Sequence, residues 1–270
     1  MRRLWLRWIG LVVFVALMGT LFVRLGEWQW HKSKARDAYN AMVRTNQVVP
    51  VAAFPGVFAP GHTIADSEQW QRITVTGSYD TAHQFQAMER SVNSQPGTEI
   101  VTPLQATNGV TVLVDRGLLP RPPGQNDPTT LPDPPAGTVT VVGYVRRDEV
   151  GTTTQITPVN HRMRLINTPA IAAQVPYPVV DGYLQLISST PAQSGGLIPL
   201  GLPQLGSGPY FSYAIQWFMF TVMAAAGVVM MIRGDLRDRR KARRRAAVAA
   251  QNRPEAQPSD QEDSHAARTD

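Results

Sequence analysis

The chain has 270 residues, of which 43% are hydrophobic, a formal net charge of +6 and no cysteine. Without cysteine it forms no disulfide and carries no thiol redox chemistry, so an exported part must be stabilised by its core alone. The basic residues do not indicate nucleic-acid binding, because residues 26–208 hold 12 basic against 13 acidic residues and the excess lies at the two ends.

The first predicted element is an apolar run at residues 9–23, which extends to 4–25 if Arg7 and Arg24 reach the membrane surface with their side chains. A bilayer core of about 30 Å requires about 20 mainly apolar residues in a helix. We therefore expect a transmembrane helix at 9–25 after a short N-terminal segment, 1–8. No small-residue cleavage site follows, which favours an uncleaved anchor over a signal peptide. Residues 27–49 lack Pro and Gly and predict a polar helical extension.

The central part of the chain alternates short apolar strands with turns. Strand patterns occupy residues 71–79, 84–88, 99–104, 110–118, 137–146 and 183–188. Asn108 and Gly109 form the strongest hairpin signal, residues 120–135 are a Pro-rich loop, and residues 170–174 favour a short helix. We expect one mainly antiparallel β domain over residues 26–208.

A second apolar run covers residues 213–232, interrupted only by Gln216, and predicts a second transmembrane helix. Eight basic residues follow it: Arg233, Arg237, Arg239, Arg240, Lys241, Arg243, Arg244 and Arg245. The positive-inside rule then places both termini in the cytoplasm and residues 26–208 outside it. The predicted fold class is an α+β membrane protein in the cell membrane. Two transmembrane helices flank a mainly antiparallel β extracytoplasmic domain, and residues 233–270 form a basic, then disordered, cytoplasmic tail.

Catalytic patterns are missing from the sequence. It contains no His-Glu-x-x-His, no Gly-x-Ser-x-Gly, no phosphate loop and no dinucleotide-binding fingerprint, so we expect no catalytic residues and no enzyme. The central histidines, His31, His62, His83 and His161, are too scattered to predict a metal site. Asp148 and Glu149 stand beside two arginines, Arg146 and Arg147, which is typical of a solvated charge cluster.

Five segments resemble, in the same order, motifs of the surfeit locus protein 1 family of cytochrome c oxidase assembly factors. They are residues 25–29 (LGEWQ, followed by Lys32 and Arg36), 112–120 (VLVDRGLLP), 142–146 (VGYVR), 183–186 (YLQL) and 211–218 (FSYAIQWF). The resemblance spans residues 8–232. It departs from the family pattern at Asp115, where the family has Asn, and in the exchanged order of Lys32 and Arg36.

This resemblance implies a non-enzymatic assembly or maturation factor for a haem–copper (aa3-type) cytochrome c oxidase. Family members are associated with haem a insertion into the catalytic subunit. The implied partners are that subunit, the haem a synthesis machinery and the lipid bilayer. The resemblance implies no permanent cofactor, and haem a is the one candidate for transient binding.

Tyr210 stands where the family has a histidine that has been proposed to bind haem a. A tyrosine can ligate ferric haem, but a tyrosine next to a transmembrane helix is commonly an interfacial anchor. Both interpretations stay open for Tyr210, and His31 is the alternative haem ligand.

The other motif residues carry physical expectations of their own. Arg116, in an apolar strand that ends at Gly117, must be paired if it is buried. Its partners are backbone carbonyls or a carboxylate such as Glu99, with Asp115 on the opposite face of the strand; alternatively Arg116 binds a haem propionate or a client loop.

We expect the outer ends of the two spans to form an interaction surface. Its residues are Trp28, Gln29, Tyr213, Gln216 and Trp217. Gln216 would need a partner in hydrocarbon, and Gln29 or a backbone carbonyl of the first helix could serve.

Two other functions fit the same sequence. One is an accessory subunit stably bound to the oxidase or a respiratory supercomplex. The other is a membrane-tethered extracytoplasmic binding module, which requires a concave apolar pocket in the central domain.

Overall fold

The computed structural model describes residues 2–122, 124–125 and 127–251. These residues form two compact units. One is the helix pair, made of the described residues up to Lys34 and from Ser207 onward. The other is the sheet domain, Ala35–Gly206.

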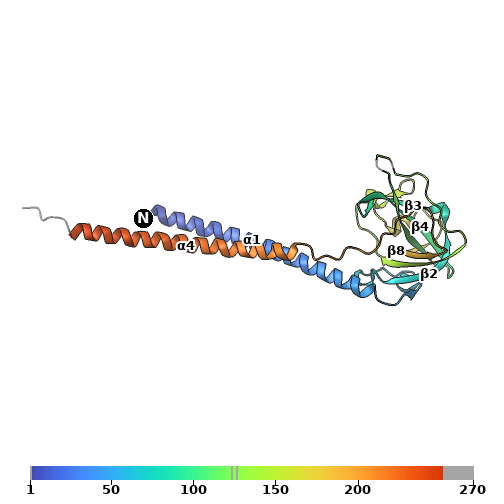
Figure 1. Ribbon diagram of the computed structural model, residues 1–270, viewed down its shortest axis with the longest axis horizontal. Coiled ribbons are helices and arrows are strands. Elements are labelled where there is room, and N and C mark those ends of the chain that lie inside the picture. The colour runs from blue at the N-terminus through green and yellow to red at the C-terminus, as the bar shows by residue number, and fades with distance from the viewer. Residues whose placement is uncertain (1, 123, 126, 252–270) are drawn as a thin grey trace, which may run out of the picture. The chain divides into compact units, whose positions relative to one another are not determined.

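The helix pair consists of α1 (Arg2–Asn46) and α4 (Tyr210–Gln251), which lie side by side (Figure 1). Helix α1 continues beyond Lys34 into the sheet domain and ends close to the predicted end of the polar extension. Helix α4 continues through the basic part of the predicted tail to Gln251, and the rest of that tail, 252–270, lies outside the described residues.

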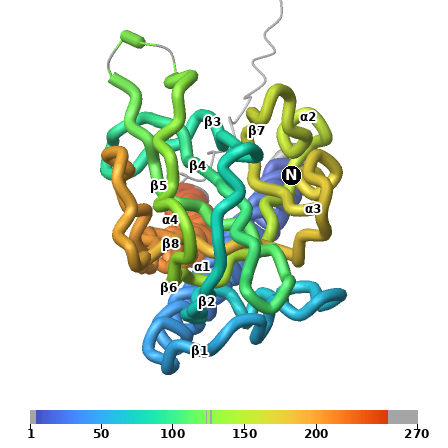
Figure 2. The backbone as a smooth tube through the Cα atoms, turned by 90° about the vertical axis from the view of Figure 1, so that its right-hand side faces the viewer, coloured from blue at the N-terminus to red at the C-terminus, as the bar shows by residue number. Residues whose placement is uncertain are grey.

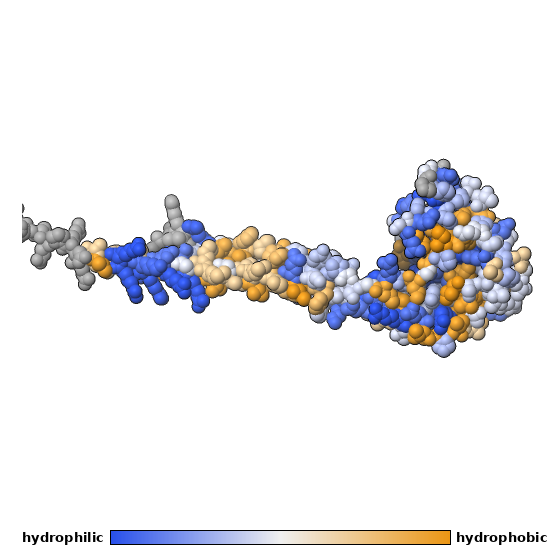
Figure 3. Space-filling view, viewed as in Figure 1, coloured by the Kyte–Doolittle hydropathy of each residue, from blue (hydrophilic) through white to orange (hydrophobic). Residues whose placement is uncertain are grey.

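Both helices are long and apolar enough to cross a membrane. In their most apolar windows only 6% of the residues of α1 and 0% of those of α4 are buried within the protein. A core helix of a soluble protein would be mostly buried. Figure 3 shows the apolar band along the helices and the strongly hydrophilic stretch toward the end of α4. The chain therefore carries two candidate membrane-spanning helices.

The sheet domain contains eight strands in the order β1-β2-β6-β8-β5-β4-β3-β7. Their bounds are β1 (Ala52–Ala53), β2 (Arg72–Tyr79), β3 (Phe85–Val92), β4 (Gln95–Ala106), β5 (Thr111–Pro120), β6 (Thr138–Arg146), β7 (Arg162–Met163) and β8 (Val179–Thr190). The pairs β1–β2, β3–β7 and β5–β8 are parallel, and the other pairs are antiparallel. This confirms the predicted mainly antiparallel domain. The helices α2 (Thr153–Ile156) and α3 (Thr168–Ala172) are grouped with β7 (Figure 2).

A second pairing of β2 closes five of the strands into a ring. Besides β6, strand β2 pairs with β4, where Gly77 lies opposite Ala106. A Cβ atom at Gly77 would lie 2.2 Å from the carbonyl oxygen of Gln105, so only glycine permits this approach. Strands β2, β6, β8, β5 and β4 therefore form a small closed barrel.

The sheet domain has two hydrophobic clusters, one on each side of the barrel wall. All five ring strands contribute to the inner cluster, for example Val75, Leu104 and Val114. The outer cluster packs β3, β4, β5 and β8 against β7 and α3, for example Phe85 and Ile171. Because β5 is buried on both faces, its successive side chains point into different layers.

Candidate functional site

The two apolar helices pack along a seam whose outer half is aromatic. A Cβ atom at Gly26 would lie 2.8 Å from the ring of Phe218, so the absent side chain lets the helices approach. The rings of Phe22 and Trp217 lie 5.6 Å apart. The two segments with motif resemblance, 25–29 and 211–218, are thus in direct contact through Gly26 and Phe218.

The predicted interaction residues divide between this seam and its surroundings. Trp217 packs in the seam, whereas Trp28, Tyr213 and Gln216 are exposed. Gln29 buries its Oε1 without a hydrogen-bond partner among the described residues. No hydrogen bond joins Gln29 to Gln216 in this part of the chain, so the suggested pair is not formed.

Tyr210 is the first residue of α4 and is half-buried. Gly208, with a left-handed φ of +63°, lets the chain turn so closely that a Cβ atom there would lie 2.9 Å from the Tyr210 ring. His31 is exposed, with Nδ1 2.7 Å from the carbonyl oxygen of Glu27.

Arg116 is almost fully buried, and its hydrogen-bond acceptors within the described residues are all neutral. Its guanidinium donates to Gln84 Oε1 at 2.9 Å, to the carbonyls of Pro132 at 2.9 Å and Asp133 at 3.2 Å, and to Gln193 Oε1 at 3.3 Å. Gln193 in turn donates to the backbone carbonyl of Arg116 at 2.7 Å. Burial lowers the pKa of Arg116. Of the two suggested kinds of partner, backbone carbonyls are confirmed.

Glu99 is not a partner of Arg116, contrary to the other suggestion, because the two side chains belong to opposite layers of the barrel wall. Gly117 has a φ of +121°, and a Cβ atom there would lie 2.6 Å from the carbonyl oxygen of Ile198. This glycine lets the segment around Ile198 pair with Leu118. Arg116 and Gly117 therefore hold two loops against β5, one with Pro132 and Asp133 and the other with Gln193 and Ile198.

Asp115 faces the other layer and lines a pocket of about 300 Å³, which we call the charged pocket. Its charged or polar lining residues include Arg90, Glu99, Asp115, Arg146, Glu149, Tyr183 and Gln185. Ser91, Val92, Trp70, Tyr39 and residues 200–203 complete the lining. The pocket therefore gathers five charged side chains from β3, β4, β5 and β6 and the segment after β6.

Arg90 carries most of the ion pairing in the charged pocket. It contacts Glu99 at 3.1 Å and also pairs with Glu149. Burial acts to lower the pKa of Arg90, but these two carboxylates raise it. The predicted solvated charge cluster is thus wrong for Glu149, which is held by Arg90, and for Asp148, which accepts a 2.7 Å hydrogen bond from Thr168.

The pKa values of two carboxyl groups in the charged pocket are raised. Burial and the neighbouring Glu99 raise the pKa of Asp115 well above its ordinary value, and its one hydrogen-bond donor among the described residues is the backbone N–H of Gly117 at 3.2 Å. Burial raises the pKa of Glu99, with Arg90 opposing and Glu149 reinforcing the shift. Because these groups interact, they titrate as a coupled pair.

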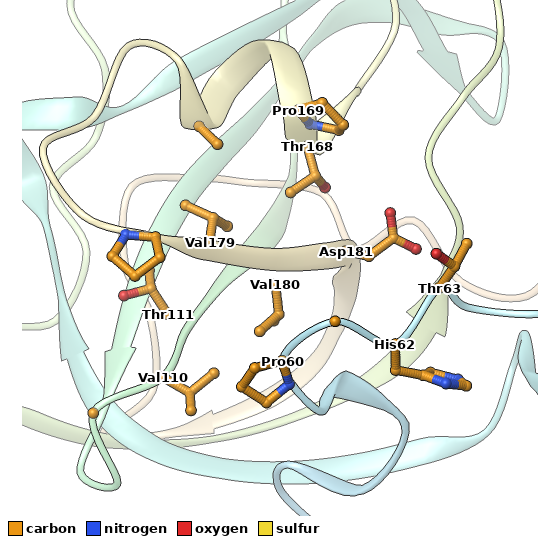
Figure 4. A pocket seen from close by; sticks show the side chains of 14 residues that line it. Pro60, His62, Thr63, Val110, Thr111, Thr168, Pro169, Val179, Val180 and Asp181 are labelled. Atoms are coloured by element: carbon orange, nitrogen blue, oxygen red, sulfur yellow. The ribbon is translucent and has the colours of Figure 1, made fainter.

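A second pocket of about 400 Å³ opens elsewhere in the sheet domain (Figure 4). Pro60, Val110, Val179 and Val180 give it an apolar lining, and Asp181 lies at its side. Asp181 accepts a hydrogen bond from the backbone of Ile64 at 2.9 Å. Among the described residues no group of three His, Asp or Glu side chains is arranged to hold a metal ion.

Comparison with known proteins gives one family. The model of the SURF1 family matches residues 16–222. Similar relatives are SURF1-like proteins of Mycobacterium bovis and of Mycobacterium tuberculosis strains CDC 1551 and H37Rv, all described as uncharacterized. Each is 32% identical over 238 residues, which is 87% of this chain and 86% of the relative.

Proposed function

The chain belongs to the SURF1 family, generally known as cytochrome oxidase assembly factors, and on this premise we propose that it assists haem a insertion into an aa3-type oxidase. In this role it is not an enzyme. Its partners are the catalytic subunit that receives haem a, the machinery that synthesises haem a, and the lipid bilayer.

One observation carries the proposal: two motif segments far apart in the sequence meet in the helix pair. Gly26 of the first segment packs against the ring of Phe218 in the second. Nearby, the ring centroids of Trp30 and Phe211 lie 5.7 Å apart. The residues by which the chain resembles its family therefore help to build one surface at one end of the paired spans. A hydrophobic cargo such as haem a is most readily passed to a membrane subunit at such a surface.

The charge distribution supports a topology for this role. Basic residues follow the apolar part of α4, and basic residues also begin α1. By the positive-inside rule both ends are cytoplasmic, and the sheet domain lies outside the cytoplasm. In this orientation the outer half of the seam is at the extracytoplasmic surface of the cell membrane.

Tyr210 is the candidate haem ligand of this surface. Haem a is cargo in this proposal, held transiently, and a phenolate is one of the known protein ligands of haem iron. Titration of the purified full chain with haem a should give a Soret shift that Tyr210→Phe weakens and His31→Ala leaves unchanged. The reverse pattern would assign the ligand to His31, and no shift in any of the three proteins would contradict the carrier role.

The proposed function itself is tested in a strain from which this chain has been deleted. The haem a absorption band of the membranes should fall and return with the wild-type chain. If the deletion leaves the band unchanged, the proposal is wrong.

The apolar pocket in Figure 4 favours a second candidate, a membrane-tethered module that binds a small ligand. An unchanged haem a band in the deletion strain would favour this module. A third candidate, an accessory subunit, is distinguished by co-purification with mature, haem-loaded oxidase.

A further inference from the structure

Arg146 is the one arginine of the charged pocket that makes no ion pair with a described carboxylate. Arg90, the other arginine of the pocket, has two carboxylate partners. The guanidinium of Arg146 makes a single hydrogen bond among the described residues, from Nη1 to Gln185 Oε1 at 2.7 Å. The positive charge of Arg146 is therefore not engaged in a direct ion pair, although it opposes the rise in the pKa of the nearby Glu99 and Asp115.

The guanidinium of Arg146 is also held in place by neutral neighbours. It stacks on Trp70, with 4.1 Å between the guanidinium carbon and the ring centroid, and lies 5.8 Å from the ring of Tyr183. Gln185 is fixed in turn, because its amide nitrogen donates to the carbonyl of Gly201 at 2.5 Å. A preorganised guanidinium loses little conformational entropy when it binds a ligand.

Two N–H groups of residues that line this pocket lack an acceptor. Nε of Arg146 and Nε1 of Trp70 have no hydrogen-bond partner among the described residues, and Trp70 is only 3% exposed. Buried donors without an acceptor are costly. A ligand that supplies oxygen acceptors would offset this cost.

The three carboxyl groups of the pocket repel such a ligand less strongly than their number suggests. Arg90 neutralises part of the charge of Glu99 and Glu149. Burial raises the pKa of Asp115, which weakens the repulsion between this carboxyl group and a bound anion.

We propose that the charged pocket binds a carboxylate or phosphate group of a small molecule or lipid against the guanidinium of Arg146. The flat guanidinium matches the geometry of these oxyanions. The volume of about 300 Å³ suits a small ligand or a headgroup. Tyr39 and residues 200–203, which line the pocket, belong to the two chain segments that lead to the helix pair, so a lipid headgroup and a free anion are both possible sources.

Trp70 offers a direct readout, because it is the only one of the six tryptophans in the sheet domain. The full chain, labelled with ¹⁵N-tryptophan in zwitterionic nanodiscs, is titrated with inorganic phosphate. The indole signal that Trp70→Phe removes should shift in a saturable way, and the other five signals should not.

Two variants test the role of Arg146. Arg146→Gln should weaken phosphate binding at least about tenfold, because it removes the charge. Gln185→Glu keeps Arg146 but gives it an internal carboxylate partner, and should weaken binding similarly even if Arg146→Gln does not fold. The matched control is Arg147→Gln, at a neighbouring arginine that pairs with Asp66 instead and does not line the pocket. It should leave the shift intact.

Nanodiscs that contain phosphatidylglycerol distinguish the sources. If the Trp70 signal moves there without added phosphate, the source is a lipid headgroup, whereas a response to phosphate alone indicates a free anion. The proposal is overturned if neither probe moves the signal, or if Arg146→Gln and Gln185→Glu respond like the wild type.

Discussion

The sheet domain and the helix pair differ in how much of their apolar side chains they bury. The sheet domain buries two apolar clusters and surrounds even a buried arginine with hydrogen-bond acceptors. The helix pair leaves large apolar side chains such as Phe14, Leu17, Val222 and Met230 exposed, and its described contacts lie along one narrow seam.

Because of this difference, we expect changes in the sheet domain to act mainly on stability and changes in the helix pair to act mainly on function. The sheet domain supplies its own core, so changes inside it should mainly alter the free energy of unfolding. The helix pair requires lipid or a protein partner to cover its apolar surface. Changes along its seam should therefore alter oxidase assembly more than they alter the unfolding of the sheet domain.

The largest expected effect is at Arg116. Arg116→Ala removes the donor shared by Gln84, Gln193 and two backbone carbonyls, and should lower the free energy of unfolding by about 3 kcal/mol or more. The loss of unfolding free energy is measured by thermal unfolding of the full chain in detergent, monitored through the β-sheet signal in circular dichroism. Arg121→Ala is the control, since this partly exposed arginine pairs, among the described residues, with Asp127 alone, and its loss should cost less than about 1 kcal/mol. Equal losses would show that the contacts of Arg116 do not stabilise the domain.

The second-largest effect is expected for a change at Gly26, in the seam between the two helices. Gly26→Leu places a side chain where the Phe218 ring lies, which should cost about 1–3 kcal/mol of helix packing and reduce the haem a band. The control is Gly10→Leu, in the same helix, where an added Cβ atom meets nothing within 4 Å. Both variants should leave β-sheet unfolding unchanged. A normal haem a band with Gly26→Leu would argue against the seam as the working surface.

A smaller, pH-dependent effect is expected at Asp115. Its folded-state pKa is raised, so its contribution to stability is fully present below the unfolded pKa of about 3.9 and is lost as the pH rises through the folded pKa, by about 1.4 kcal/mol per unit. Asp115→Asn, which mimics the protonated form, should therefore unfold at a higher temperature than the wild type at pH 8, with a smaller gain at pH 5. A gain that does not change with pH would contradict this assignment.

The smallest expected effect is at Gln216. It is exposed and makes no described hydrogen bond to Gln29, so Gln216→Leu should change helix packing by less than about 0.5 kcal/mol. Disulfide crosslinking is a suitable measurement, because the chain has no native cysteine to interfere. Cysteines at Phe22 and Trp217 should crosslink equally with either residue at 216. Loss of the haem a band despite unchanged crosslinking would indicate that Gln216 contacts the client.

Local patterns predicted both long helices and six of the eight described strands, all but the two-residue strands β1 and β7, because neighbouring residues in the sequence carry the signal. Alternation around Ile73 and Val75 indicated β2, and Asn108 with Gly109 indicated the turn between β4 and β5. The closure of the barrel through Gly77 was not predicted, because it depends on the pairing of β2 with a strand almost 30 residues away.

The sites were less predictable for the same reason. A buried Arg116 was expected to need partners, but Gln84 and Gln193 are 32 and 77 residues away in the sequence. The charged pocket was missed because Glu149 was interpreted from its neighbours Arg146 and Arg147, whereas its partner Arg90 is 59 residues away. The alternation of β5, which places Asp115 and Arg116 on opposite faces, was the one sequence signal that two separate polar sites exist.

The most direct test of the proposed function is the haem a content of the oxidase catalytic subunit purified from a strain that lacks this chain. We predict that the subunit is present in the membrane with much less haem a per polypeptide, and that the wild-type chain restores the ratio while Gly26→Leu does not. A normal ratio of haem a to catalytic subunit in the deletion strain would contradict the account.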